Sequence, residues 1–442
     1  MLADALGSAP DWVGLVLGPP RVYPPLPWVV LGAIHVLQYV FIVYTLYTVV
    51  LPVAGLWTRE LTVRVPPRHR FAIVVPAHNE ERVVGNLIES CLALDYPREL
   101  FDIYVVADNC TDGTAEVAAR AGARVIVREN RSERGKGYAL EYAFRVLAAG
   151  HERYDAYVIF DADNLVHPDF LNVMNAHLSR GDKIIQGRMD SKNPTDTWVS
   201  GTFSMSVWVS NRFWFLAKHN LGLSSVLGGT GMCIAADVLH RIGWGATSFT
   251  EDLEFTMKAL CQGIKTVWAH NAICYDEKVQ TFKASWRQRR RWVQGQLTVA
   301  RRYLLPLLWR GVSQLSIVHL EAAFQVFEPL YLLLGTTLLA LSYLVPGEFL
   351  QSALLAHLNT IYFWGFLTFV EYSMPAAAML IDRAPLRTLL YLPLYPVFLN
   401  SWIPLTWAGA LGPRPRHWTH TEHTRSVGLQ ELLAARAGGR RP

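Results

Sequence analysis

Residues 155–163 read DAYVIFDAD, an apolar run that ends in two carboxylates. Such short apolar runs, rich in β-branched and aromatic residues, are typical of buried strands. Three runs of the same kind precede it: FAIVVPAH (71–78), FDIYVVAD (101–108) and ARVIVRE (123–129). The segments between the runs have helical spacing. This βαβαβαβ order predicts an α/β domain whose parallel sheet is covered by helices on both faces.

Polar residues follow these strands, and in open α/β sheets ligands bind beyond the carboxyl ends of the strands. The residues at these ends are His78, Asn79, Glu80, Asp108, Asn109, Thr111, Asp112, Asp161 and Asp163. The chain has no GxGxxG after its first strand and no GxxxxGK[ST], which argues against a dinucleotide fold and a P-loop.

Asp161 and Asp163 stand two residues apart, so on a strand end they would project to the same side. A buried strand rarely ends in two uncompensated acids without a cation. Carboxylate oxygens suit Mg²⁺ or Mn²⁺, with substrate phosphates completing the coordination. The alternative is a capped turn without a metal.

Two further segments combine charge with a predicted helix start. In ERGKGYAL (133–140), Lys136 could meet a phosphate at a helix N-terminus; the alternative is a flexible turn with a solvated lysine. In TSFTEDLEF (247–255), Thr250 could cap a helix that Glu251 and Asp252 open. Either acid could only cap the helix, or one could be a general base.

Composition indicates a membrane protein. Hydrophobic residues make up 51% of the 442 residues and charged residues 17%, and the net charge of +5 is too small for a general polyanion binder. No Lys, Arg, Asp or Glu occurs from Trp28 to Trp57, which exceeds the roughly 20 residues that a spanning helix needs. Arginines follow this stretch, so the N-terminus is expected outside and residues from about 58 in the cytosol. The five cysteines form no CxxC pair and fit a reduced compartment.

Three more apolar stretches follow the α/β region: Pro329–Val345, Phe349–Leu380 and Leu389–Leu411. Glu371 interrupts the second and is expected to face other helices or a cavity rather than lipid. Three prolines predict that the third is kinked or broken. The tail after it is basic, so we expect this stretch to re-enter without crossing.

The stretch SWRQRRRWVQGQ (285–296) lies just before these spans and predicts an interfacial helix with aromatic anchors. Its position argues against nucleic acid as the partner. The arginines expected to meet anionic lipid headgroups are Arg287, Arg289, Arg290, Arg301 and Arg302.

The motifs VVPAHNEE, VVADNCTDGT, FDAD, TED and QRRRW occur in this order over about residues 70–296. In this the chain resembles the membrane-embedded processive family 2 glycosyltransferases, which include cellulose, chitin, hyaluronan and poly-N-acetylglucosamine synthases. The resemblance implies a Rossmann-like α/β GT-A fold joined to an α-helical transmembrane region, a nucleotide sugar as donor (usually a UDP-sugar), and Mg²⁺ or Mn²⁺ as cofactor.

The resemblance also implies roles for the residues of the donor site. Glu80 and Asp108 would lie near the base and ribose, and Lys136 would contact the diphosphate. Asp161 would lie by the nucleotide, and Asp163 would bind the metal.

The remaining roles concern the acceptor side. Asp252, beside Glu251, would be the general base. Gln288, Arg291 and Trp292 would lie over the diphosphate and the acceptor sugar, where the planar guanidinium of Arg291 suits bidentate phosphate contact. The residues Gly229 and Thr230 fall where the family places a loop near the acceptor.

The expected organisation has five parts. They are an N-terminal segment with a transmembrane helix (1–57), a cytosolic GT-A domain (58–284), interfacial amphipathic helices with QxxRW (285–314), C-terminal transmembrane helices (315–411) and a basic cytosolic tail (412–442). We expect a multi-pass protein of the cell membrane.

The expected function is inverting transfer from a UDP-sugar that elongates a β-linked polysaccharide and exports it across the bilayer. The alternative is a non-processive transferase that adds one sugar to a lipid, and a catalytically inactive scaffold is a third hypothesis. The sequence departs from the best-studied synthases, because ADN (107–109) replaces a double aspartate and no clear FxVTxK gating loop is present. The short tail leaves no room for a PilZ-like domain, so direct cyclic-di-GMP control is not expected.

Overall fold

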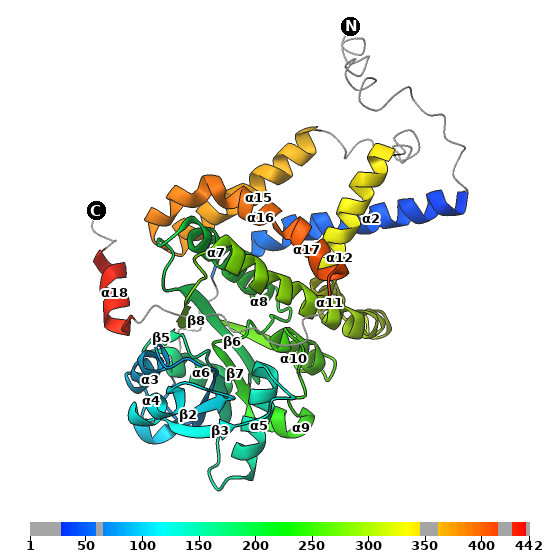
Figure 1. Ribbon diagram of the computed structural model, residues 1–442. Helices are drawn as coiled ribbons and strands as arrows, with labels where there is room; N and C mark the ends of the chain where they lie inside the picture. The colour runs from blue at the N-terminus through cyan, green and yellow to red at the C-terminus, as the bar shows by residue number, and fades with distance from the viewer. Residues whose placement is uncertain (1–27, 59–64, 345–360, 414–426, 439–442) are drawn as a thin grey trace.

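A computed structural model describes residues 28–58, 65–344, 361–413 and 427–438. Figure 1 shows a sheet with its helices at one end of the molecule and the long apolar helices at the other, with helix α11 between them. Residues 414–426 and 439–442 of the predicted basic tail and residues 349–360 of the predicted stretch 349–380 lie outside the described residues.

The sheet has eight strands in the order β3-β2-β1-β4-β7-β6-β8-β5. Strands β1 to β4 are mutually parallel, as their apolar runs predicted. The strands are β1 Phe71–Ala77, β2 Phe101–Asp108, β3 Arg124–Arg128, β4 Ala156–Ile159, β5 Leu165–Val166, β6 Ile184–Ser191, β7 Met232–Ala235 and β8 Thr266–Asp276.

The other half of the sheet is mixed, so the prediction of a purely parallel sheet was wrong. Strand β7 runs antiparallel to both β4 and β6, and β5 runs antiparallel to β8. Strands β6 and β8 are parallel, with a register shift between Gly187 and Arg188. Their sequences, IIQGRMDS and TVWAHNAICYD, carry polar residues and glycine and therefore lack the continuous apolar run of a buried parallel strand.

Alternate residues of each central strand enter different cores, because successive side chains of a strand point to opposite faces. Ile73 and Val75 pack with α3, α4 and α6, whereas Ala72 and Val74 pack with α5, α9 and α10. Helices therefore cover both faces of the sheet, as predicted. These helices are α3 Val84–Leu92, α4 Thr114–Arg120, α5 Lys136–Ala149, α6 Phe170–Ser179, α9 Ala236–Ile242 and α10 Glu251–Leu260.

Among the residues that the structure describes, three helices at the apolar end are long and apolar enough to cross a bilayer, at Gly32–Gly55, Ile317–Leu341 and Trp364–Ile381. The elements concerned are α2 Trp28–Val50, η2 Leu51–Gly55, α12 Ile317–Leu344 and α15 Ile361–Ile381. The proline-containing stretch that follows is broken into short pieces, as predicted. These are η5 Leu386–Leu394, α16 Tyr395–Asn400 and α17 Trp402–Leu411.

Helix α11 (Phe282–Ser313) joins the two ends of the molecule, with α7 (Trp198–Val209) and the π-helical η4 (Ser210–Leu216) beside it. Arg289 on α11 is fully buried, so its predicted contact with lipid headgroups was wrong. Its guanidinium lies 4.2 Å from the ring centroid of Phe398 and 5.1 Å from that of Trp402, and it donates a hydrogen bond of 2.9 Å to Ser401 Oγ. Aromatic rings and a hydroxyl thus replace water around this cation.

The other arginines of α11 that were expected to meet headgroups are less buried than Arg289. Arg287 and Arg301 are exposed and Arg290 is half-buried, so these side chains can reach the surface. The side chain of Arg302 is also 63% exposed, but it pairs with Glu254 at 2.6 Å.

A buried ion pair ties the apolar helices to the sheet domain. Arg212 on η4 pairs with Asp382, which directly follows α15, and both side chains are 3% exposed. Arg212 also donates to the carbonyl of Gly55 at the end of η2, at 3.0 Å. His270 on β8 lies 3.4 Å from the same carboxylate of Asp382. Arg212 therefore joins the ends of two candidate spans, and the carboxylate of Asp382 extends this contact to strand β8.

We predict that Asp382→Ala lowers the thermal unfolding midpoint of the detergent-solubilised protein clearly. Removing one partner of a buried pair leaves an uncompensated charge, which costs about 3–5 kcal/mol. Asp237→Ala serves as the control, because Asp237 pairs with Lys183 on the surface, where side-chain exposures are 63% and 49% and such pairs contribute little. Equal midpoints for the two variants would contradict this account.

Candidate active site

One cavity of about 980 Å³ begins at the carboxyl ends of β1, β2 and β4 and extends to the apolar helices. The sequence-predicted site residues all line it: Glu80, Asp108, Lys136, Asp161, Asp163, Gly229, Thr230, Glu251, Asp252, Gln288, Arg291 and Trp292. Residues that lie up to 212 positions apart are therefore brought to one place, as expected for a parallel half-sheet whose strand ends share an edge.

The end of β2 holds a paired acid. Asp108 is buried, and its Oδ1 accepts a hydrogen bond of 2.6 Å from Arg128 on the neighbouring strand β3. Burial raises the pKa of Asp108, and the charge of Arg128 opposes this. Glu80, after β1, is buried nearby, and its backbone N–H donates to Thr114 Oγ1 at 2.8 Å. The carboxylate of Asp108 is thus held by Arg128, and the backbone of Glu80 is held by Thr114.

Lys136 opens α5, as its sequence predicted, directly after Gly135 in the left-handed region at φ 126°. Its ammonium donates hydrogen bonds of 2.5 Å to Asp161 Oδ1 and to the carbonyl of Gly229. It also lies 3.9 Å from Glu251. Burial alone would lower the pKa of Lys136, but these carboxylates raise it overall. The lysine therefore stays charged and joins two loops and the start of a helix in the cavity.

Asp161 and Asp163 lie in the turn between β4 and β5 rather than on the strand, so the expected strand-end geometry was wrong. Their environments also differ. The Asp161 side chain is 41% exposed, whereas Asp163 is buried and accepts a hydrogen bond of 3.0 Å from the backbone N–H of Glu277. Lys192 donates to the carbonyl of Asp163 at 2.5 Å. The turn is therefore held by residues from β6 and from the end of β8.

The carboxylate oxygens near this turn fit a divalent cation as ligands. Asp276, the last residue of β8, lines the cavity, and one of its carboxylate oxygens is buried without a hydrogen-bond partner among the described residues. Its pKa is raised by burial, lowered by Lys278 and raised further by Asp163. No group of three or more His, Cys, Asp or Glu side chains in the described ranges forms a metal site of protein ligands alone. Mg²⁺ commonly takes one or two carboxylates together with substrate phosphates, which Asp163 and Asp276 match.

Glu251 and Asp252 begin α10, as predicted, but the hydroxyl of Thr250 makes no capping hydrogen bond. Burial raises the pKa of Glu251 to about 7, an effect that Lys136 opposes and Asp252 strengthens. Burial likewise raises the pKa of Asp252 to about 6, against a hydrogen bond from the Leu253 N–H. Carboxylates with pKa values this close to neutrality are suited to accepting a proton.

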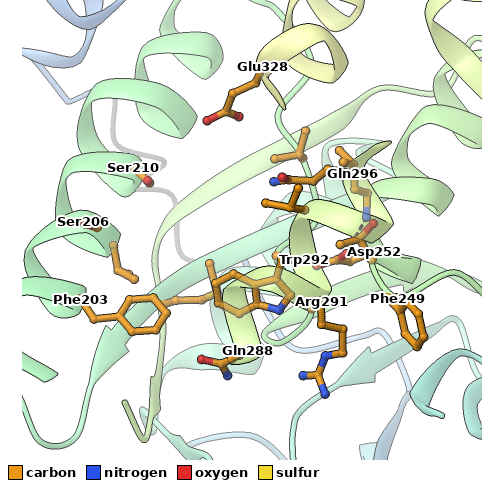
Figure 2. Close-up of a pocket in the computed structure, with 18 of the residues that line it drawn as sticks. Phe203, Ser206, Ser210, Phe249, Asp252, Gln288, Arg291, Trp292, Gln296 and Glu328 are labelled. Atoms are coloured by element: carbon orange, nitrogen blue, oxygen red, sulfur yellow. Dashed lines mark hydrogen bonds between the residues drawn. The ribbon is translucent and has the colours of Figure 1, made fainter. Parts of the chain in front are cut away.

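Three residues of the QxxRW motif line the cavity from α11, and Figure 2 shows Trp292 beside Asp252 and Gln288 and Arg291 below it. Trp292 packs edge-on against Phe203, with ring centroids 5.8 Å apart. Burial lowers the pKa of Arg291, and the negative charges of Glu251 and Asp161 oppose this. The guanidinium therefore belongs to the same electrostatic cluster as Lys136.

Beyond Trp292 the cavity continues among the candidate spans. Tyr44 and Thr45 of α2, Glu328 of α12 and Glu371 of α15 line this part. Figure 2 shows Glu328 directed toward the space beside Ser206 and Ser210. Glu371 thus faces a cavity, as predicted for an acid inside an apolar stretch.

Sequence analysis missed several residues of this site. Asp276 ends β8 and Lys278 follows it, and because β8 was not predicted as a strand, no strand-end argument could reach these residues. Their signal was the dense charge of YDEK (275–278) after an apolar segment. Phe203 and Glu328 lie in helices α7 and α12, and no sequence pattern indicated that these helices pack against the motifs.

Comparison with known proteins agrees with this geometry. The family model described as glycosyltransferase like family 2 matches residues 67–295, just over half of the chain. A probable glycosyltransferase of Bacillus subtilis is 24% identical over 53% of this chain and 57% of that protein. A β-monoglucosyldiacylglycerol synthase of Synechocystis is 28% identical over 52% and 48%, and a poly-β-1,6-N-acetyl-D-glucosamine synthase of Staphylococcus aureus is 22% identical over 51% and 54%. The chain spans about half the length of these relatives.

Among solved structures, the mannosyltransferase PcManGT of Pyrobaculum calidifontis, determined with GDP-mannose and Mn²⁺, is similar with a TM-score of 0.50. The likeness covers 78% of this chain and 98% of that chain at 20% identity. At this identity the likeness concerns the fold, and it confirms the predicted GT-A domain joined to a helical region.

We predict that Gly295→Ala destabilises the protein and displaces α11. A Cβ on Gly295 would lie 2.6 Å from Thr250 Oγ1 and 2.8 Å from the Thr250 backbone nitrogen, and such overpacking costs about 1–3 kcal/mol. Gly365→Ala in α15 is the matched control, because nothing lies within 4 Å of its Cβ and alanine favours helix. A lower unfolding midpoint for Gly295→Ala alone is expected; the same midpoint for both variants would contradict the close approach of α11 to the loop before α10.

Proposed function

This chain belongs to the family 2 glycosyltransferases, and from that premise we propose that it transfers a sugar from a UDP-sugar, with inversion, to an acceptor held at the membrane, and so elongates a β-linked polysaccharide. The observation that carries the proposal is the single cavity that joins the charged cluster around Lys136 to the apolar helices. Donor and acceptor can reach this cavity from opposite ends.

The donor would occupy the end of the cavity at the sheet. The buried carboxylates Glu80 and Asp108 would bind the base and ribose, and Lys136 and Arg291 would contact the diphosphate. Asp163, with Asp276, would hold Mg²⁺ or Mn²⁺, which when bound neutralises the charge that develops on the departing nucleotide. When phosphates replace Asp161 as partner of Lys136, the lysine keeps its charge because Glu251 remains close.

Inversion requires a base on the acceptor hydroxyl and no covalent nucleophile. Asp252 is suited to be this base, since its carboxylate faces Gly229 and Lys136: a Cβ on Gly229 would lie 3.3 Å from Asp252 Oδ2 and 3.7 Å from Lys136 Nζ. Trp292 and Phe203 would offer ring faces and edges to the acceptor sugar. Holding the acceptor hydroxyl in line with the donor lowers the entropic part of the barrier.

The acceptor would extend into the part of the cavity between the candidate spans. Glu328 and Glu371 lie near the middle of two of these spans and can accept hydrogen bonds from sugar hydroxyls. Polar groups at such positions in membrane proteins usually mark a substrate pathway. A growing glycan that leaves through this region would be exported as it is made.

A lipid acceptor is the second candidate, and one observation favours it. The β-monoglucosyldiacylglycerol synthases are 26–28% identical to this chain, compared with 22% for the poly-N-acetylglucosamine synthases. A lipid whose headgroup enters the cavity from the bilayer would receive one sugar. The third hypothesis, a catalytically inactive scaffold, does not account for the cluster of charged residues around Asp252.

The decisive experiment incubates the purified full-length protein with a panel of UDP-sugars and Mg²⁺ or Mn²⁺. We expect UDP release together with a polymer product, and a single-sugar glycolipid would establish the second candidate instead. Asp163→Ala and Trp292→Ala are expected to remove most turnover while leaving the unfolding midpoint near that of wild type. Absence of UDP release with every donor would overturn the proposal.

The pH dependence tests the base directly. Because the pKa of Asp252 is raised to about 6, this carboxylate gains a proton as the pH falls through 6, and kcat is expected to fall with it. At higher pH the base is ionised and kcat should reach a plateau. Asp252→Asn should lose most activity and the acidic limb, as measured by UDP release from pH 5 to 8. Survival of that limb in Asp252→Asn would assign the base to another group.

A further inference from the structure

The helix α18 (Leu429–Gly438) packs on the sheet domain, and Figure 1 shows it on the side of the sheet where β5 lies. Leu432 on this helix is buried against Leu165 of β5 and Tyr275 of β8. These two residues are paired across the strands. Leu165 follows Asp163 by two positions, and Tyr275 immediately precedes Asp276, so α18 covers the back of the turn that carries the proposed metal ligands.

Arg436 anchors this helix to the same region. Its guanidinium donates hydrogen bonds of 2.6 Å to Asp190 Oδ2 and to the carbonyl of Ser191, both at the end of β6. It also lies over the ring of Tyr275, 4.6 Å from the centroid. Asp190 is buried, and its other oxygen accepts a hydrogen bond of 2.8 Å from Trp208 Nε1. Without Arg436 this buried carboxylate would lose its only counter-charge within an ion-pair distance in the described residues.

The end of β6 leads directly to the proposed metal turn. Lys192 follows Ser191; its backbone N–H donates to the carbonyl of Asp276 at 2.8 Å, and its ammonium donates to the carbonyl of Asp163 at 2.5 Å. Lys192 is itself buried. Two successive contacts therefore connect the guanidinium of Arg436 to the backbone of both candidate ligands.

We propose that Arg436 is a positioning residue for the divalent-cation site and that α18 acts as a clasp that holds the Asp163 turn and the end of β8 in their metal-binding arrangement. This inference rests on the proposed function, since it presumes that Asp163 and Asp276 bind a cation together with UDP. The clasp acts through β6, and Arg436 itself does not line the cavity.

The test measures binding of UDP by the full-length protein in detergent micelles, by calorimetry, at a series of Mn²⁺ concentrations. For Arg436→Ala we expect the Mn²⁺ concentration for half-maximal UDP binding to rise about tenfold, as for other residues that orient metal ligands. Saturating Mn²⁺ should restore kcat for UDP release, because the ligands themselves remain. Arg436→Lys keeps the charge but not the two-pronged contact or the ring stacking, so a smaller rise is expected.

Gln430→Ala, on the exposed face of the same helix, is the control and should bind like wild type. An unchanged Mn²⁺ midpoint in Arg436→Ala, or a loss of binding stoichiometry at an unchanged midpoint, would overturn the clasp. If Arg436→Ala fails to fold, Arg436→Lys decides by the same criteria. If the wild-type protein binds no UDP with Mn²⁺, the proposed function fails and the clasp fails with it. If the wild-type protein binds UDP normally and Arg436→Ala has the same Mn²⁺ midpoint, only the clasp is overturned.

Discussion

The ammonium group of Lys136 is the contact on which the site depends. It joins the turn after β4 through Asp161, the loop before β7 through the Gly229 carbonyl, and the start of α10 through Glu251. Without a cation among them, these carboxylates and Asp252 would repel one another and shift their pKa values upward. One buried lysine thus allows several acids to share a small space, and in the proposed reaction it would exchange a carboxylate for a phosphate of the donor.

The catalytic geometry also depends on how α11 is seated. Gly295 lets the helix approach Thr250 closely, and this brings Trp292 and Arg291 over the start of α10. On the other side, Arg289 is enclosed by Phe398 and Trp402 near the apolar helices. The same helix therefore touches the acidic cluster and the proposed membrane region, and a movement of one would be transmitted to the other.

Much of the fold and most of the candidate site could be predicted from the sequence. Strands β1 to β4 are continuous apolar runs, and their ends carry the polar residues that line the cavity, so local pattern and topology agree. Strand β8 could not be predicted because it is polar in part and pairs with distant segments, and Asp276 was missed with it. The burial of Arg289 was not predicted because a charged side chain is usually exposed. Its burial depends on Phe398 and Trp402, which lie more than a hundred positions away in the sequence. The contact of Arg436 with Asp190 likewise joins residues whose spacing carries no local signal.

The tie between Arg212 and Asp382 has a consequence for the proposed reaction in a bilayer. Asp382 closes α15 at its end, and Arg212 holds that end, together with Gly55, against the sheet domain. If these helices cross a bilayer, this tie would hold the cavity at a fixed height relative to the hydrocarbon layer. The distance between the acceptor's reactive hydroxyl and the lipid surface would then decide whether it reaches the donor. The chemistry of the acceptor alone would not be enough.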